Sequence, residues 1–420
     1  MTDDIMNFDL PVVNHSIIKV IGVGGGGSNA VNHMYQQGIK DVEFVICNTD
    51  AQALEESSIP TKIQLGQSLT EGLGAGNKPE RGKDAAVESI DNIREVLSQG
   101  TKMAFITVGM GGGTGTGAAP IVAEAAKELD ILTVGIVTIP FKFEGKRRIH
   151  QAMEGINNLK KHVDSLLVIN NERLRDIYGN LELSEAFGYA DNILTVAAKG
   201  IAEIITVHGH MNVDFADVNT VMSDSGVALM GTGRAEGENR AVSAVKEALE
   251  SPLLSNNNIR GAQNILLNVT SGQQEITMDE IGEISDYVQD IAGNEADIIL
   301  GTGNDDSLDQ HISVTVIATG FHENTISELV AHKHTEAPKP IPERRLELDN
   351  DSNTTQSLDP KEEAIKTIYG DNDTLEIDLE LPKETGLDSD KTRDLTDQSQ
   401  AKTIDDMHQK PAYLRNKNKS

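Results

Sequence analysis

Cysteine, positive charge and long apolar runs are scarce in this chain of 420 residues. A single cysteine, Cys47, excludes an internal disulfide and favours a reducing compartment. Lys and Arg number 36 against 66 Asp and Glu, and the formal net charge of -30 argues against nucleic acid as the main partner. The longest apolar stretch, residues 131–141, contains Pro140 and is too short to cross a bilayer. The acidic start of the chain lacks the basic and apolar pattern of a signal peptide, so we expect a soluble, cytoplasmic protein.

Glycine, by contrast, is concentrated in a few places. Residues 109–117 read Gly-Met-Gly-Gly-Gly-Thr-Gly-Thr-Gly, and they lie between an apolar run and an Ala-rich helical pattern that begins at Ala118. Glycines at a strand-to-helix turn leave backbone N–H groups free to surround an anion, and the helix N-terminus adds partial positive charge. The turn lacks the lysine of the GxxxxGK[ST] loop. It therefore predicts a phosphate site of another nucleotide-binding class.

Two further glycine-rich stretches occur at residues 22–29 and 72–77. The first satisfies GxGxxG after a predicted strand, which alone indicates a dinucleotide fold, with Glu43 and Asp50 near the spacing of a ribose-binding acid. Close packing of helix on strand is the structural alternative for these glycines. A dinucleotide needs only one such turn, so three of them favour the longer phosphate chain of a nucleoside triphosphate.

Strand and helix patterns alternate from residue 17 to residue 209. Strands are predicted at residues 17–21, 42–47, 104–108, 132–139 and 166–169. Helices are predicted at residues 29–37 and, as one long element, at 184–208. This alternation indicates a doubly wound, mostly parallel α/β sheet, in which ligands sit at the carboxyl ends of the strands. Residues 225–320 are predicted to form a smaller α/β domain, with helices near 241–249 and 278–291 and strands at 265–269, 297–300 and 312–317.

The composition changes after Phe321. From about residue 322 to residue 403 the chain is rich in Asp, Glu, Thr, Ser and Asn without a periodic apolar pattern, which predicts a disordered acidic linker. After Asp406 no acid remains, and basic residues surround Tyr413 and Leu414. A basic and apolar tip on an acidic tether is typical of a peptide that docks on a partner, and a frayed terminus is the alternative.

The long predicted helix carries a candidate base site. Phe187 and Asp191 lie one turn apart and share a face. An aromatic ring can stack on a purine, and a carboxylate can accept from guanine N1–H and the exocyclic amine, so this pair would select GTP over ATP. A core Phe beside a solvated Asp is the alternative. Asn171, past the fifth predicted strand, is either a ribose contact or an ordinary loop residue.

Glu144 and Arg148 follow the fourth predicted strand within a charged segment. They are either ribose and phosphate contacts or part of a solvated charge run. His208 and His210, at the end of the long helix, have no Cys or His partners at zinc spacing and are expected to be structural.

Asp214 and Asp217 follow the long helix and lie three residues apart. This is the spacing of an N-cap and a first-turn acid, so helix capping is the plain interpretation. The alternative is that the carboxylates polarise a water for attack on a γ-phosphate. A helix from Phe187 to residue 209 rises roughly 30 Å, so the two acids cannot reach phosphates bound by their own chain. They could reach those of a neighbour stacked head to tail, an arrangement that builds filaments and makes hydrolysis depend on polymerisation.

These residues together resemble the FtsZ family, the bacterial relatives of tubulin. The similarity covers about residues 17–320 and is carried by residues 22–30, 48–54, 109–120, 143–148 and 212–218. By that resemblance, GTP or GDP is held by Gly25, Gly26, Gly27, Ser28, Asn29, Gly113, Thr114, Gly115, Glu144, Arg148, Asn171, Phe187 and Asp191. A synergy loop activates hydrolysis in the adjoining subunit through Asn212, Asp214 and Asp217. Mg²⁺ is expected to enter on the phosphates, without a metal site of the protein's own.

The chain departs from the family pattern at a few positions. Asn77-Lys78-Pro79 stands where Ala-Asn-Pro is common, Asn170 replaces a frequent Pro, and Tyr413 stands where Phe is usual.

The resemblance implies a GTPase that polymerises head to tail into the cytokinetic ring at midcell. It implies a flexible N-terminus (residues 1–16), a Rossmann-like GTP-binding domain (17–183), a central core helix (184–209), the synergy loop and following helix (210–224), a C-terminal α/β domain (225–320), an acidic linker (321–405) and a partner-binding peptide (406–420). Membrane-anchoring and regulatory division proteins are expected to bind this peptide around Pro411, Tyr413, Leu414 and Arg415, with no membrane insertion of the chain itself. The rival functions are a nucleotide-dependent oxidoreductase and a GTP-binding scaffold that does not hydrolyse.

Overall fold

The computed structural model describes residues 16–39, 41–178, 182–206, 211–251, 259–293 and 296–321. All of them belong to one compact unit. The predicted N-terminal segment, the linker beyond residue 321 and the C-terminal peptide lie outside the described residues, as do His208 and His210. In the part of the chain that is described, no helix is long and apolar enough to span a bilayer.

A mixed sheet of 10 strands has the order β3-β2-β1-β4-β5-β6-β7-β10-β8-β9. Its N-terminal part is parallel and consists of β1 (Ile18–Val23), β2 (Val42–Asn48), β3 (Thr61–Gln64), β4 (Met103–Gly109), β5 (Leu132–Ile139) and β6 (Ser165–Asn170). Since parallel strands share one direction, their carboxyl ends meet at a single edge. The predicted doubly wound α/β fold is confirmed.

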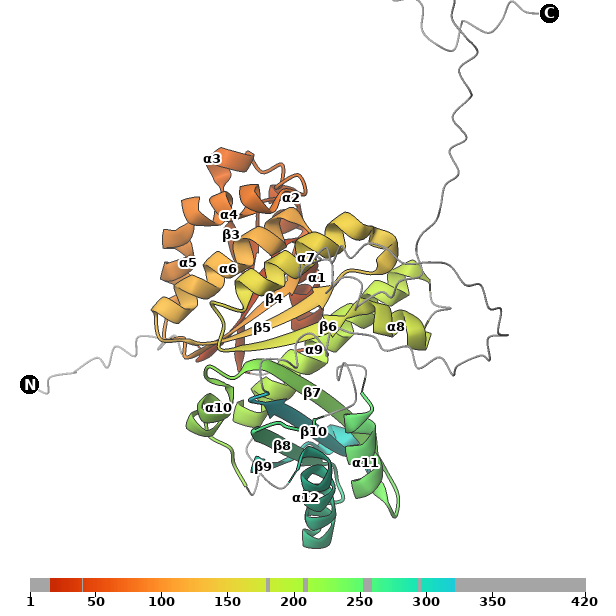
Figure 1. Ribbon diagram of the computed structural model, residues 1–420. Helices are drawn as coiled ribbons and strands as arrows, with labels where there is room; N and C mark the ends of the chain where they lie inside the picture. Colours follow the sequence, from red (N-terminus) through yellow and green to blue (C-terminus); the bar gives the residue numbers. More distant parts are fainter. Residues whose placement is uncertain are drawn as a thin grey trace, which may run out of the picture. The chain divides into compact units, whose positions relative to one another are not determined.

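Helices cover both faces of this parallel part (Figure 1). One face packs against α1 (Gly24–Gln36) and α9 (Leu183–Thr206). The other packs against α4 (Pro79–Glu88), α5 (Ile90–Leu97), α6 (Gly113–Glu128) and α7 (Lys146–Leu159). Successive side chains of a strand alternate between the faces, so Ile18 and Val20 of β1 join the first core and Ile21 and Val23 the second.

Helix α9 is the long helix that the sequence predicts. Its 24 residues bury an apolar stripe against the sheet that includes Ile193, Leu194, Ala197, Ala198, Ile201 and Ile204. Short elements complete this half: α2 (Ala51–Glu56), α3 (Gln67–Thr70), the 3-10 turn η1 (Lys142–Glu144) and α8 (Asn171–Tyr178).

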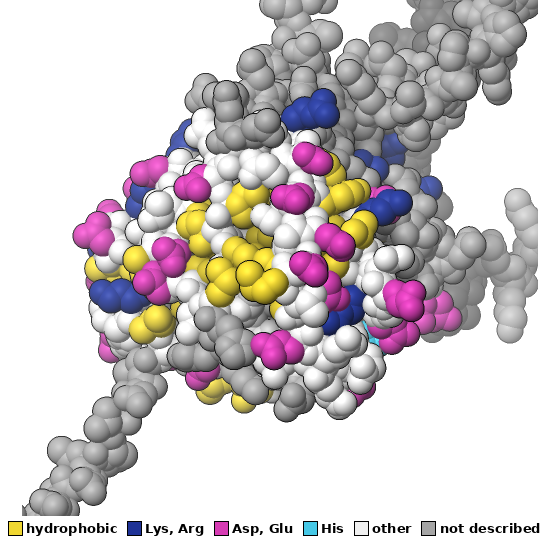
Figure 2. Space-filling view, turned by 90° about the horizontal axis from the view of Figure 1, so that it is seen from below, with side chains coloured by type: hydrophobic (Ala, Val, Ile, Leu, Met, Phe, Trp, Pro, Cys, Tyr) yellow, Lys and Arg dark blue, Asp and Glu magenta, His cyan; other side chains and the backbone are white. Residues whose placement is uncertain are grey.

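The second half begins with α10 (Phe215–Met222) and β7 (Gly226–Ala235). The elements that follow are α11 (Arg240–Leu249), β8 (Asn264–Ser271), α12 (Met278–Ala292), β9 (Asp297–Asn304), the 3-10 turn η2 (Asp306–Leu308) and β10 (Ile312–Thr319). Strand β10 pairs antiparallel with β7 and β8, while β9 runs parallel to β8 and leaves Ile298, Ile299 and Leu300 only half-buried. Seen from below, this side of the molecule gathers hydrophobic side chains at its centre, with acidic side chains around them (Figure 2).

A buried arginine ties the second half together. Arg240, only 1% exposed, donates from Nε and Nη2 to the carboxylate of Glu280 at 2.7 and 3.1 Å. It also donates to the backbone carbonyls of Gln274, Glu275 and Gln310. One guanidinium therefore fixes α11 to the start of α12 and to the loops beside it.

Two strands were not predicted from the sequence, and the predicted starts of two helices are wrong. Strand β3 is only four residues long, and β7 is interrupted by glycines that read as a loop. Helix α1 was expected from Asn29 and α6 from Ala118, but they begin at Gly24 and Gly113. The glycine runs are thus the first helical turns rather than loops before them.

Candidate nucleotide-binding site

The glycine turns at residues 22–29 and 109–117 pack backbone against backbone at the carboxyl edge of the parallel strands. Strands β1 and β4 are neighbours, and each runs into one of these turns. A Cβ at Gly24 would lie 2.6 Å from the backbone nitrogen of Gly115, and one at Gly26 would lie 3.1 Å from Cα of Gly109. Packing therefore explains these glycines. Gly25 differs, because it is exposed and a Cβ there would meet nothing within 4 Å.

Both turns also begin a helix. The N-cap residues, Val23 for α1 and Gly112 for α6, make no side-chain capping hydrogen bond. N–H groups in the first turn of a helix have no partner within it, and with the helix dipole they attract an anion. Two such helix ends meeting at one edge suit a chain of phosphates.

Two of the residues predicted for the site carry a buried polar atom that lacks a partner among the described residues. These atoms are Oγ of Ser28, early in α1, and Oδ1 of Asn171, the first residue of α8. Asn29 is exposed, whereas Gly27 is buried with a Cβ position only 2.3 Å from the carbonyl oxygen of Thr107. Buried polar groups are nearly always hydrogen-bonded, so Ser28 and Asn171 fit a site that a polar ligand completes.

The third glycine stretch, residues 72–77, reaches the same place. It follows α3 rather than a strand, yet a Cβ at Gly113 would lie 2.8 Å from the backbone nitrogen of Lys78. Hydroxyl oxygens of Thr49, after β2, and Thr114, in α6, are 2.6 Å apart. The glycine turns after β1 and β4 and this stretch therefore converge on the start of α6.

The predicted base residues lie on the first turns of α9. Phe187 is 40% exposed and meets the ring of Phe141 edge-on, with centroids 5.4 Å apart. One turn further, burial raises the pKa of Asp191 to about 6, while the electrostatic effect of His33 on α1 acts in the opposite direction. The half-exposed ring and the half-buried carboxyl share one face, as a purine site requires.

Glu144 and Arg148 form an ion pair next to the glycine turn at residues 109–117, with an N···O distance of 2.8 Å. The other carboxylate oxygen of Glu144 accepts from the backbone N–H of Phe141 at 2.9 Å. A Cβ at Gly111 would lie 2.9 Å from the carbonyl oxygen of Arg148. Glu144 therefore links Phe141 to Arg148, and the backbone of Arg148 packs against Gly111.

Asp214 and Asp217 cap α10 reciprocally, as the plain interpretation of their spacing predicts. Their loop is held by a bridge between Met211 and Thr302 of β9, with N···O distances of 3.0 and 2.9 Å. Val213 is buried in the core, while Asn212 and Asp214 are exposed. The loop is thus held to β9 while its polar side chains face the surface.

The acids and the base residues lie at different ends of α9. Phe187 and Thr206 are separated by about 29 Å at the rise of an α-helix. In Figure 1, α8 lies beside the start of α9 and α10 lies on the opposite side of the molecule. The structure therefore brings together the residues predicted for phosphates, ribose and base, and places Asn212, Asp214 and Asp217 away from them.

The alternative ribose acids do not fit a dinucleotide site. Glu43 lies near the amino end of β2 and pairs with the buried Lys19 of β1. Asp50 caps α2 by accepting from the backbone N–H of Ala53 at 3.2 Å. Among the described residues, no group of three or more His, Cys, Asp or Glu side chains is placed to hold a metal ion.

Sequence reasoning missed His33 and Phe141 at the base site. His33 sits in the α1 pattern as an ordinary helix residue, and only the packing of α1 against α9 brings it to Asp191. Phe141 lies in the charged segment that contains Glu144 and Arg148, and no sequence pattern there distinguishes its ring.

Two family descriptions match the chain. The model for the Tubulin/FtsZ family, GTPase domain, matches residues 17–179, and that for the FtsZ family, C-terminal domain, matches residues 226–322. The fold and the converging glycine turns therefore define a tubulin-type GTPase.

Individual relatives narrow this class. The cell division protein FtsZ of Porphyromonas gingivalis is 50% identical over 337 residues, which cover 79% of this chain and 73% of that protein. The chain belongs to the FtsZ family and is a GTPase. The alternative of a nucleotide-dependent oxidoreductase is therefore wrong.

Solved structures agree with this assignment. The FtsZ dimer, empty, of M. jannaschii is 44% identical, with a TM-score of 0.68 and coverage of 73% of this chain and 88% of that chain. The GTPgS bound protofilament of CetZ2 from Haloferax volcanii is 18% identical, with a TM-score of 0.62 and coverage of 74% and 96%. At that identity the second likeness concerns the fold alone.

Proposed function

We propose that this protein polymerises head to tail into filaments that form the cytokinetic ring at the midcell division site, and that GTP is hydrolysed between subunits. The observation that carries this proposal is the separation of two polar sites along α9. Glycine turns and base residues lie at one end, and the capped acids lie at the other.

The glycine edge has the chemistry of a GTP site. The N–H groups of Gly25 and of the Gly113–Gly115 turn, with the side chains of Ser28 and Asn29, hold the phosphates. Glu144, Arg148 and Asn171 contact ribose and phosphate, Phe187 stacks on guanine, and Asp191 accepts from its N1–H and exocyclic amine. Mg²⁺ enters with the phosphates and neutralises part of their charge there.

The capped acids have the chemistry of a water-activating loop. Capping uses one oxygen of each carboxylate, Oδ1 of Asp214 and Oδ2 of Asp217. The second oxygen of each carboxylate makes no hydrogen bond with the described residues and remains available to a water. Asn212 and the two acids, supplied by one subunit, orient that water toward the γ-phosphate bound by the next.

Two similar proteins support this proposal. The relative from P. gingivalis is a cell division protein by name, and the M. jannaschii relative was solved as a dimer. We further propose that the acidic segment to residue 405 tethers the filament. Residues 406–420, including Pro411, Tyr413, Leu414 and Arg415, would then bind membrane-anchoring and regulatory division proteins in the cytoplasm.

The test is light scattering and phosphate release over a series of protein concentrations, with GTP or ATP. We expect scattering with GTP only, and a specific activity that rises with concentration. Isolated monomers that turn over GTP as fast as assembled protein would overturn hydrolysis between subunits.

A mixing experiment locates the acids. Asp214→Asn subunits retain a good N-cap but lose the negative charge, so they should co-assemble with the wild-type protein and lower its specific activity. Asp279→Ala, which removes an exposed acid from the first turn of α12, is the matched control and should not lower it. An Asp214→Asn variant with full activity of its own would refute the assigned role.

A further inference from the structure

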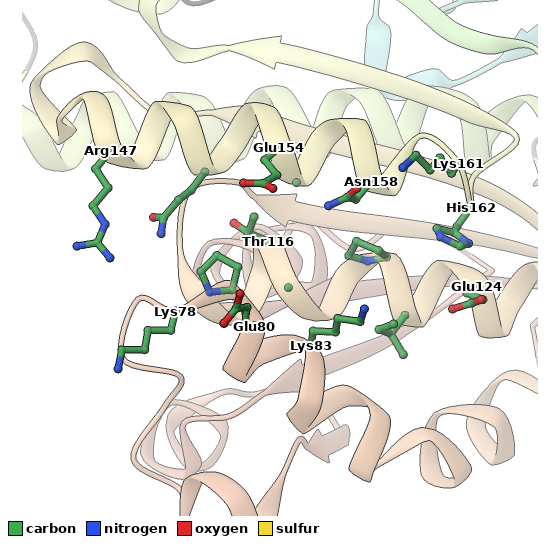
Figure 3. A pocket seen from close by; sticks show the side chains of 16 residues that line it. Lys78, Glu80, Lys83, Thr116, Glu124, Arg147, Glu154, Asn158, Lys161 and His162 are labelled. Carbon is green, nitrogen blue, oxygen red and sulfur yellow. The ribbon is translucent and has the colours of Figure 1, made fainter. Parts of the chain in front are cut away.

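A second cavity lies between α4, α6 and α7, with a volume of about 650 Å³ (Figure 3). None of the residues assigned to the GTP site lines it. Its volume falls within the roughly 300–1,000 Å³ that is usual for small-molecule sites. The cavity is therefore large enough for a separate ligand.

Two glycines allow close contacts between the helices that form this cavity. A Cβ at Gly117 of α6 would lie 1.9 Å from the carbonyl oxygen of Pro79 in α4, and one at Gly155 of α7 would lie 2.4 Å from Cγ2 of Thr116 in α6. Helix α6 is thus in close contact with both α4 and α7 at the wall of the cavity. The space is preformed, as ligand sites usually are.

Cationic side chains line the cavity without carboxylate partners. Lys78, Lys83, Arg147 and Lys161 are lining residues, and none of them forms an ion pair within 4.0 Å among the described residues. Figure 3 shows Arg147 and Lys78 at one end, and Lys161 with His162 at the other. Four unpaired cations in one cavity are notable in a chain of formal net charge -30.

Three carboxylates also line the cavity, but at least two of them have other roles. Glu80 lies in the first turn of α4, where a negative charge complements the helix dipole. The pKa of the Arg94 guanidinium is raised chiefly by its hydrogen bond with Glu128, and Glu124 of α6 adds a smaller electrostatic effect there. Glu154 has a partner of its own. The cations are therefore not neutralised by direct pairing inside the cavity.

Between its two charged ends the cavity is lined by apolar side chains and one amide. Pro79, Pro120 and Ile121 supply apolar atoms. Gln151 contributes an amide whose Oε1 is buried without a hydrogen-bond partner among the described residues. This combination suits an elongated molecule whose body is apolar and carries a hydrogen-bond donor.

We propose that the cavity between α4, α6 and α7 binds a small elongated organic anion that carries a carboxylate or phosphate group at each end. Arg147 and Lys78 hold one end, and Lys161 and Lys83 hold the other. This proposal does not depend on the filament or on catalysis between subunits.

The test is equilibrium dialysis and calorimetry with full-length protein saturated with GDP, which keeps the nucleotide site filled. The probes are naphthalene-2,6-dicarboxylate and fructose 1,6-bisphosphate, which distinguish the two kinds of anionic group. Naphthalene-2,6-dimethanol is the uncharged control. We expect saturable binding of at least one anion at one site per chain, with no saturable binding of the diol.

Neighbouring residues provide matched variants. Lys161→Ala and Arg147→Ala should each weaken binding about 1.5- to fivefold, the range for a solvent-exposed ion pair. Lys160→Ala and Lys146→Ala alter the residues next to these two in the sequence, which do not line the cavity, and should leave affinity unchanged. Reversing charge in the Lys83→Glu variant should abolish binding, with its thermal unfolding temperature as a check on folding.

Absence of saturable binding by both anions would overturn the proposal. So would equal losses in the Lys160 and Lys161 variants, since that would indicate a general charge effect at this surface. Loss of the calorimetric signal when the excess of GDP is raised further would assign the probe to the nucleotide site and also refute the proposal.

Discussion

Asp214 and Asp217 each cap the backbone of the other: Oδ1 of Asp214 accepts from the N–H of Asp217 at 2.9 Å, and Oδ2 of Asp217 accepts from the N–H of Asp214 at 3.1 Å. The same two carboxylates are the groups to which we assign water activation. Each carboxylate thus caps the helix with one oxygen and is assigned water activation with the other, and substitutions should separate the two roles.

Asp214→Ala removes the cap and should lower the free energy of unfolding by about 1 kcal/mol, whereas Asp214→Asn should change it little, because Asn caps as well as Asp. Both variants should lose GTP turnover. Denaturant unfolding followed by circular dichroism, beside a phosphate-release assay, measures the two effects. An Asp214→Asn variant that is stable and still turns over GTP would show that Asp214 only caps the helix.

Nucleotide affinity should fall below pH 6. By the proposed assignment guanine donates to the ionised form of Asp191, and burial raises the pKa of this carboxyl to about 6. Protonation removes the acceptor, so affinity should be complete well above pH 6 and about tenfold lower at pH 5, one unit below the pKa. Fluorescence of a labelled GDP across pH 5–8 measures this. Asp191→Asn should bind more weakly with a flat profile, and an equally flat wild-type profile would contradict the assignment.

Gly24 and Gly25 should respond differently to alanine. Gly24 has φ of +72°, and a Cβ there would lie 2.6 Å from the backbone nitrogen of Gly115, so Gly24→Ala should cost more than about 1–2 kcal/mol of stability. A Cβ at Gly25 faces open space, so Gly25→Ala should fold normally and weaken nucleotide binding instead. Thermal unfolding and GDP titration distinguish them. Equal destabilisation by both would show that the two turns are not packed as described.

Truncating the buried Arg240 should destabilise the second half strongly. Arg240→Ala leaves Glu280 and three carbonyls without their donor, and removal of one partner of a buried pair costs about 3–5 kcal/mol. Lys246→Ala, at an exposed position of the same helix, should change stability by less than about 0.5 kcal/mol. The free energy of unfolding from urea titration is the measurement.

The hydrogen bond from Arg240 also holds the pKa of Glu280 below its ordinary value. A depressed carboxyl pKa stabilises the fold above the unfolded pKa, and this contribution is lost as pH falls through the folded value. The difference between wild type and Arg240→Ala should therefore shrink in acid, and a difference that grows there would contradict the pairing.

Local patterns in the sequence predict the parallel sheet and the long helix well. Apolar runs such as residues 104–108 are easy to recognise because a strand buried on both faces is apolar along nearly all of its length. Strand β7 could not be found this way, since Gly231 and Gly233 weaken its pattern. A Cβ at Gly233 would lie 2.2 Å from the carbonyl oxygen of Ala244 in α11, so the glycine reflects a tertiary contact.

The candidate site was predictable only where its residues cluster along the chain. The glycine turns, Phe187 with Asp191, and Asp214 with Asp217 are each local patterns. That His33 faces Asp191, or that Lys78 and Arg147 share a cavity, depends on how distant helices pack. Helix propensity also gave the wrong starts for α1 and α6, because it treats glycine as a breaker, whereas packing of the two turns against each other requires it.

Strands β6 and β7 join the two halves of the sheet through only three residue pairs, Ser165 with Gly226, Leu166 with Val227, and Leu167 with Ala228. The ladders on either side are longer, with six pairs between β5 and β6 and seven between β7 and β10. A ladder with fewer hydrogen bonds resists shearing least. Tension applied across the sheet in a single-molecule pulling experiment should therefore part it at this seam before either half unravels.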